Sequence, residues 1–166
     1  DRITAHHEKL LDNPTAYAQA VTAQAQVFPE GSLFPWTFSV HAYTNLAMAN
    51  DSERAHALAR IEALLPPAIR AVEAHLGAPL LQVKDAGQQA TWAGQLQLAL
   101  ACYHRLGGTK WKAERAFLDA QLAAALDARQ GKPLDSSPGL LWPFDTAPVL
   151  LGLRMADLAD GTTHHT

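Results

Sequence analysis

Residues 139–158 read GLLWPFDTAPVLLGLRMADL, an aromatic-proline-aromatic-acid start followed by a helical run with almost no polar face. A helix that is apolar all round is expected to be buried, because none of its sides suits water. An earlier stretch has the same layout, with residues 34–37 (FPWT) in the places of residues 142–145 (WPFD). The two stretches predict an internal repeat.

The composition predicts an apolar, soluble protein. Of 166 residues, 48% are hydrophobic and 17% are charged, which is enough to bury a large core. The net charge is −3, and the scattered Lys and Arg residues predict no nucleic-acid surface. We recognise neither a signal peptide nor an apolar stretch of the roughly 18 residues that a membrane span needs. The compartment stays open between cytoplasmic and extracytoplasmic.

No metal site, cofactor or disulfide is predicted. Cys102 is the single cysteine, which excludes an internal disulfide and a cysteine-based zinc site. We expect it to be a small buried residue rather than a nucleophile. The adjacent histidines at 6–7 and 164–165 lack the i, i+4 separation that places two metal ligands on one helix face.

The helical spacing predicts an all-α fold in which outer helices with a charged face alternate with inner helices almost without one, at a period of about 50 residues. A short helix is predicted at 1–12, and the predicted outer helices cover 15–27, 53–65 and about 111–131. Another helix can run from the Pro66-Pro67 pair to 75 or 76, ended by Gly77. The inner helices cover 36–50, 89–106 and the run after 145. The long connections, 28–35, 77–88 and 131–145, all precede inner helices. They are therefore expected to gather on one rim.

Three segments carry a family resemblance: WAGQLQLAL at 92–100, LGG at 106–108 and PGLLWPFD at 138–145. Together with the regular alternation of outer and inner helices, these segments resemble the α/α-toroid enzymes. The resemblance is to domains like linalool dehydratase/isomerase in particular and, more distantly, to glucuronyl epimerases and polysaccharide lyases. The resemblance covers most of the chain and implies a ring of helical hairpins.

The chain departs from this family in two ways. Such rings usually close with about six hairpins, and this chain supplies about three. Residues 1–166 are therefore one all-α domain or a fragment of a larger toroid, whose remainder is missing, supplied by another chain, or absent from a smaller arc. The family's dehydratase-like members also share active-site cysteines, for which this chain offers only Cys102, inside a helix.

His41 and Asp145 are the candidate catalytic residues. His41 lies on a polar stripe with Thr37 and Asn45, where it can face a central cavity and exchange protons near neutral pH. The alternative is a core histidine that hydrogen bonds to a neighbour. Asp145 precedes an apolar helix, where it can act as a general acid or base, or simply cap the helix.

Helix N-termini on one rim favour an anionic or polyhydroxylated ligand. The aromatic residues there can stack on sugars or line an apolar pocket, or they can fill the core. The charged pair in the loop at 84–85 can bind a substrate carboxylate and relay a proton, or remain solvated. The predicted ligand-binding residues are Trp36, Tyr43, Lys84, Asp85, Trp92, Gln95, Trp142 and Phe144.

Two functions follow. The first is a lyase, isomerase or hydrolase that acts by acid–base chemistry on a carbohydrate or a small hydroxylated or unsaturated molecule. The second is a non-catalytic helical-repeat scaffold that holds a glycan or a protein partner. A second fragment or a second copy is the expected partner that completes the toroid. A convergent acid–base pair in one pocket favours the enzyme, and an open arc with an exposed apolar flank favours the scaffold.

Overall fold

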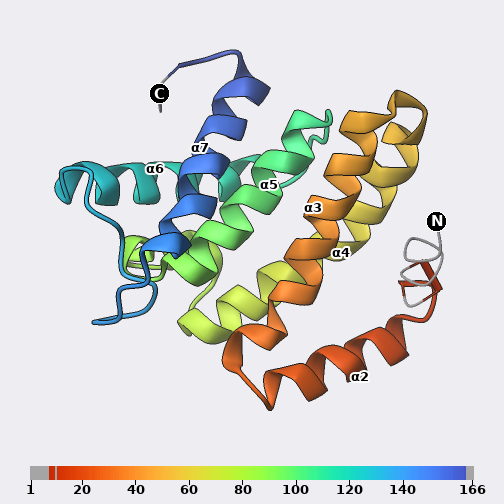
Figure 1. Cartoon of the computed structure of the whole chain (residues 1–166), viewed down its shortest axis with the longest axis horizontal. Helices are drawn as coiled ribbons and strands as arrows, with labels where there is room; N and C mark the ends of the chain where they lie inside the picture. Colours follow the sequence, from red (N-terminus) through yellow and green to blue (C-terminus); the bar gives the residue numbers. More distant parts are fainter. Residues whose placement is uncertain (1–7, 10, 164–166) are drawn as a thin grey trace.

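The computed structural model describes residues 8, 9 and 11–163, and within them the chain is helical without a strand. The predicted all-α class is therefore confirmed for this part of the chain. Most of the predicted helix at 1–12 and both histidine pairs lie outside the described residues. The helices are α2 (Pro14–Ala25), α3 (Phe34–Ala49), α4 (Arg54–Leu76), α5 (Gln95–Arg105), α6 (Lys112–Ala128) and α7 (Thr146–Asp160) (Figure 1).

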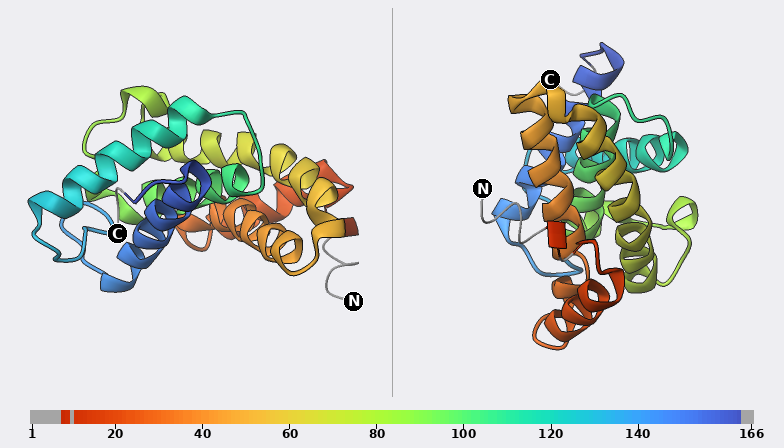
Figure 2. Two further views of the ribbon diagram at one scale, coloured as in Figure 1. Left: turned by 90° about the horizontal axis from the view of Figure 1, so that it is seen from above. Right: turned by 90° about the vertical axis from the view of Figure 1, so that its right-hand side faces the viewer.

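Three helices form what we call the inner layer: α3, α5 and α7 run in the same direction, with α5 between the other two (Figure 1). Behind this layer, α4 packs against α3 and α5, and α6 crosses α5 and α7 (Figure 2). The N-terminal ends of the inner layer lie on one edge, where the connections that precede them also lie. Within the described residues this layer does not close into a ring, and α3 and α7 are its two ends (Figure 1).

The Pro66-Pro67 pair does not end a helix, contrary to the prediction. It lies inside α4, which has 23 residues and continues to Leu76. Proline inside a helix removes a backbone donor and is unfavourable by itself. The apolar face of α4 offsets this effect, since most helical stability comes from packing of such a face and Leu65 and Ala68 on either side are fully buried. Gly77 ends the helix with a left-handed φ of 70°, as predicted.

The second predicted inner helix, 89–106, consists of a π-helical turn, Ala90–Gly94, followed by α5. Every residue from 90 to 103 is buried. The backbone N–H groups of Ala90 and Thr91 donate to the carbonyls of Asp135 and Ser136, at 2.9 and 3.4 Å. The connection before α7 therefore supplies acceptors for the first N–H groups of this helix.

Helix α7 is buried on one side only, so the expectation of complete burial is wrong. Its buried side packs so closely on α5 that a Cβ on Gly94 would come within 2.5 Å of Val149 Cγ2. On the other side, Leu150 and Leu151 keep 55% and 53% of their surface exposed. The cause is position, because α7 ends the inner layer and has an inner neighbour only in α5. No described helix is both long enough and apolar enough to cross a membrane.

Candidate functional site

One stripe of α5 and its π-turn remains slightly accessible, and it runs along the inner layer. Thr91, Gln95, Leu98 and Cys102 each expose 5% to 8% of their surface, whereas Leu96 and Leu100 on the other sides expose none. The spacings of four, three and four residues place the stripe on a single helix face. Helices α3 and α7 flank α5 (Figure 1). The stripe contacts both sides, with Cys102 beside Thr44 of α3 and Thr91 bonded to Asp145, just before α7.

The polar residues of α3 lie beside this stripe. The Thr44 hydroxyl donates to the carbonyl of Val40 at 2.8 Å and lies beside the thiol of Cys102, so these two residues are at the same level of α3 and α5. Thr37 and Gln95 each precede this contact by seven residues, about two turns. Since the helices run in the same direction, Thr37 and Gln95 lie at the same level. We call Thr37, His41, Thr44, Thr91, Gln95 and Cys102 the polar track.

Three polar atoms of the track are buried and have no hydrogen-bond partner among the described residues. They are the Thr37 hydroxyl oxygen, His41 Nε2 and Gln95 Oε1. Buried polar atoms are nearly always hydrogen bonded, to protein, water or ligand. Unpaired atoms are not confined to the track, since other residues also carry them: Trp92, Gln97, His104 and Arg115. The three on the track leave hydrogen-bonding capacity on α3 and α5 that an additional molecule could use.

His41 is neutral at physiological pH, because burial lowers its pKa to about 4. Its ring lies 6.2 Å from that of Phe38, one turn earlier in α3. No carboxylate is paired with it in the described part of the chain. His41 can therefore donate or accept a hydrogen bond, depending on its tautomer, but it is a weak base.

The Cys102 thiol is not an activated nucleophile. Burial raises its pKa to about 11, although the neighbouring Thr44 hydroxyl lowers it.

Asp145 joins α7 to the start of α5. Its side chain makes no capping hydrogen bond to α7, so the interpretation of Asp145 as a side-chain cap is wrong. Instead, the buried carboxylate accepts a 2.6 Å hydrogen bond from the Thr91 hydroxyl. His41 lies on the opposite side of α5, and no hydrogen bond within the described residues connects it with Asp145. The structure thus does not bring the two candidate proton carriers into one hydrogen-bonded pair.

The connection before α7 folds on itself around Ser136. Its hydroxyl accepts a 2.9 Å hydrogen bond from the backbone N–H of Trp142, and the Thr146 hydroxyl accepts one from the backbone N–H of Leu134, at 2.9 Å. This folding leaves the side chains of Trp142 and Phe144 in solvent, 62% and 69% exposed. The two aromatic residues form an accessible rim at the N-terminal end of α7.

The other predicted binding residues are not on the polar track, except Gln95. Trp36 packs edge-on against Tyr17 at 4.7 Å, and Trp92 is buried with its ring stacked on His75 at 3.9 Å. The Tyr43 hydroxyl donates to Glu8 at 2.6 Å. Two exposed loop residues complete the set: Lys84 and Asp85.

Sequence reasoning missed a buried polar network that ties α6 to its neighbours. Gln97 of α5 donates to Asp119 of α6 at 2.6 Å, and Arg115 of α6 pairs with Asp160 of α7 at 2.5 Å. The available signal was Arg115 and Asp119, an i, i+4 pair of opposite charge on a helix with an apolar face. These contacts hold helices together and offer no open site.

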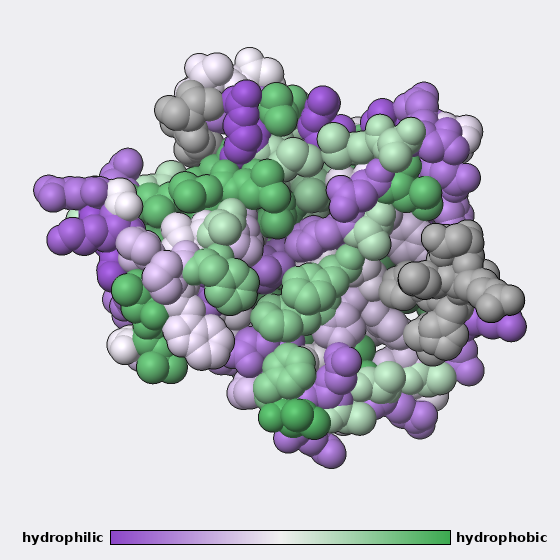
Figure 3. All heavy atoms as spheres, in the orientation of Figure 1, coloured by the Kyte–Doolittle hydropathy of each residue, from purple (hydrophilic) through white to green (hydrophobic). Residues whose placement is uncertain are grey.

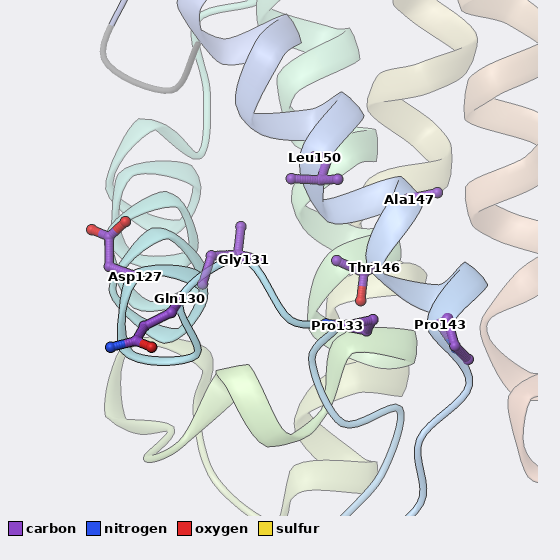
Figure 4. A pocket seen from close by; sticks show the side chains of 9 residues that line it. Asp127, Gln130, Gly131, Pro133, Pro143, Thr146, Ala147 and Leu150 are labelled. Atoms are coloured by element: carbon purple, nitrogen blue, oxygen red, sulfur yellow. The ribbon is translucent and has the colours of Figure 1, made fainter.

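A cavity of about 490 Å³ lies between the end of α6 and the start of α7 (Figure 4). Its lining is mostly apolar, and the side chains of Asp127 and Gln130 point away from Thr146 at its centre. Neither His41 nor Asp145 lines it. This cavity therefore does not hold the predicted acid–base pair.

Within residues 8, 9 and 11–163, no group of three or more His, Cys, Asp or Glu side chains is placed to hold a metal ion. Comparison with known protein families, curated proteins and solved structures finds no match for this chain. The inference of function therefore depends on the geometry of the inner layer.

Proposed function

We propose that this chain is a binding module, a half-ring of helical hairpins that a second copy closes, with its inner layer facing an enclosed space that holds a small hydroxylated ligand. The observation that carries the proposal is the apolar flank of the arc. Exposed apolar side chains gather over α7 and its rim and over α3, with hydrophilic residues between them (Figure 3). The largest of them are Phe38, Met48, Leu140, Leu141, Trp142, Phe144, Leu150, Leu151 and Leu158.

An apolar flank of this kind is typical of an interaction surface. Soluble monomers rarely expose large contiguous apolar patches, and the terminal units of a repeat array carry unpaired faces when the array is incomplete. Here the two ends of the inner layer, α3 and α7, are the helices that expose apolar side chains. The helix between them, α5, has inner neighbours on both sides and is buried from Gln95 to Tyr103.

A second copy fits both ends at once. A two-fold axis parallel to the inner helices would place α7 of each copy beside α3 of the other, so that two identical contacts cover both apolar ends. All inner helices of the pair would then run in the same direction, three from each copy. The two polar tracks would face a common interior, and the toroid resemblance would extend to a closed ring.

Binding, rather than acid–base catalysis, is the function that the site favours. His41 stays neutral because its pKa is about 4, and Asp145 already accepts the hydrogen bond of Thr91. Hydrogen-bonding atoms without partners suit a neutral hydroxylated molecule such as a sugar, which offers both donors and acceptors. The lyase or isomerase hypothesis would require His41 to transfer a proton at a physiological pH, which lies well above its pKa of about 4.

The first test is the mass of the particle in solution. We expect twice the 17.9 kDa of one chain by sedimentation velocity at micromolar concentration. Leu151→Asp should give monomers, because it would place a charge in each of the two contacts between the copies. Ala120→Asp, at an exposed position of α6, should leave the dimer intact. A wild-type chain that stays monomeric at every concentration would reject the closed ring.

The second test addresses the ligand separately. A panel of neutral sugars should include one that raises the melting temperature of the wild-type dimer, and Gln95→Leu should remove that shift because it deletes the unpaired acceptor. Gln121→Leu on α6, away from the track, is the matched control. If no sugar acts, or if both variants respond as the wild type does, the polar track does not bind a hydroxylated ligand.

A further inference from the structure

A second cavity, of about 450 Å³, lies where α2, the first turn of α3 and the middle of α4 meet. It is separate from the polar track, with which it shares no residue. Its volume is within the range of small-molecule pockets. The lining residues are Leu11, Pro14, Tyr17, Ala18, Trp36, Arg60, Ala63, Leu64, Pro66, Pro67 and Arg70.

The walls of this cavity are apolar and rigid. Tyr17 and Trp36 form an edge-to-face pair, and the Tyr17 hydroxyl is tied to the carbonyl of Pro35 at 2.8 Å, which fixes the rings in place. On the α4 side, Pro66 and Pro67 present ring surface and carry no backbone N–H. A ligand that fills this space must therefore be largely hydrophobic.

The two arginines of the cavity differ in their partners. Arg60 is ion-paired with Glu8 and, at 2.7 Å, with Asp12, so its charge is already matched. Arg70 lies ten residues further along α4, about 15 Å away. It is exposed and has no ion pair among the residues that the structure describes. One end of the apolar cavity therefore carries an available positive charge, and the other end does not.

We propose that this cavity binds an apolar monocarboxylate. Its hydrocarbon part lies against Trp36, Tyr17 and the prolines, and its carboxylate pairs with the guanidinium of Arg70, the geometry in which arginine forms its strongest hydrogen bonds. A dicarboxylate is disfavoured, because the second charge would meet Glu8 and Asp12 at the Arg60 end. The site does not depend on the dimer proposed above.

The experiment uses decanoate as the probe and decanol as its neutral counterpart, with affinities measured by calorimetry on the full chain. We expect decanoate to bind and to shift the indole N–H signal of Trp36, assigned with Trp36→Phe, in nitrogen-15 NMR spectra. Decanol should bind about tenfold more weakly, since it lacks the charge-assisted pair with Arg70. The proposal is overturned if decanoate does not bind, if decanol binds equally well, or if the Trp36 signal does not move.

Matched variants locate the site. Arg70→Gln should weaken decanoate binding about tenfold, whereas Arg105→Gln, another exposed arginine, should not. Ala63→Phe should fill the cavity and abolish binding, whereas Ala59→Phe, one turn earlier on α4 and outside the lining, should leave it intact. Leu151→Asp should also keep full affinity. Equal losses in a variant and its control, or loss in Leu151→Asp, would place decanoate elsewhere and reject the proposal.

Discussion

Helices α5 and α7 are both weakly charged helices of the inner layer, yet they differ in how much of their surface is buried. Every residue of α5 from Gln95 to Tyr103 is buried, whereas α7 leaves Leu150, Leu151 and Leu158 about half exposed. Both use small residues to approach each other, with Gly94 against Val149 and Gly152 against Gln97. The difference comes from neighbours, because α5 is surrounded by four helices and α7 stands at the end of the arc.

This comparison shows what an apolar sequence does and does not imply. Apolar composition predicts that a helix face needs cover, but it does not say that the same chain provides the cover. For α5, other helices of the same chain provide the cover. For α7 it is incomplete in the described chain, and the proposed second copy would supply it.

The sharpest test of the comparison uses one tryptophan from each region. Trp92→Ala, at the start of α5, should destabilise the protein by about 3–5 kcal/mol, because the ring is 2% exposed. Trp142→Ala, before α7, should cost less than about 1 kcal/mol, because the side chain is 62% exposed. Urea unfolding of the isolated monomer, in the Leu151→Asp background, measures both. Similar losses would mean that the two regions do not differ in burial.

An intermediate effect is expected at the contact between the two regions. Thr91→Val removes the hydroxyl that donates to the buried Asp145 carboxylate and should cost about 1.5–3 kcal/mol. Thr22→Val on exposed α2, where the hydroxyl bonds only to the carbonyl of Ala18, is the matched control and should cost less than about 0.5 kcal/mol. Chemical denaturation measures the difference. If Thr91→Val proved as mild as the control, Asp145 would not join α5 to α7.

The smallest predicted effect is a dependence on pH. Burial lowers the His41 pKa from 6.5 to about 4, so the unfolded chain binds a proton between these values and the folded chain does not. Stability should therefore fall as pH decreases from 7 to 5, by up to about 2 kcal/mol from His41.

His41→Phe should flatten this part of the stability profile, measured by urea unfolding at several pH values. Burial also lowers the pKa of His104, although its hydrogen bond to the Lys110 carbonyl raises it, so a residual slope of the same sign should remain. His104→Gln should reduce that remainder. An unchanged slope in His41→Phe would show that His41 is not held neutral by burial.

The sequence predicted much of the local structure. Helical spacing located the inner and outer helices, and Gly77 marked the end of α4 because only glycine readily takes its positive φ. Prolines at the first turn were compatible with helix starts, although α3 begins at Phe34, before the predicted Trp36. These features depend on residues close together in the chain, which is why their pattern is visible there.

The candidate site was predicted only in part. Thr37 with His41 on a polar stripe, and Gln95 as a binding residue, were named from the sequence, and all three belong to the polar track defined above. The hydrogen bond between Thr91 and Asp145 spans 54 residues, and no pattern near either residue indicates it. The stacking of His75 on Trp92 was equally invisible, because it depends on how two helices cross.

The sequence alone therefore determined which segments are helical and which of their faces must leave water, since periodicity and turn chemistry are local. Only the tertiary structure decided that Pro66 and Pro67 lie within one helix, that α5 is buried from Gln95 to Tyr103 and that α7 is left with a free face. Those outcomes depend on which distant segments pack together, and the free energy of that packing outweighs local preference where the two conflict.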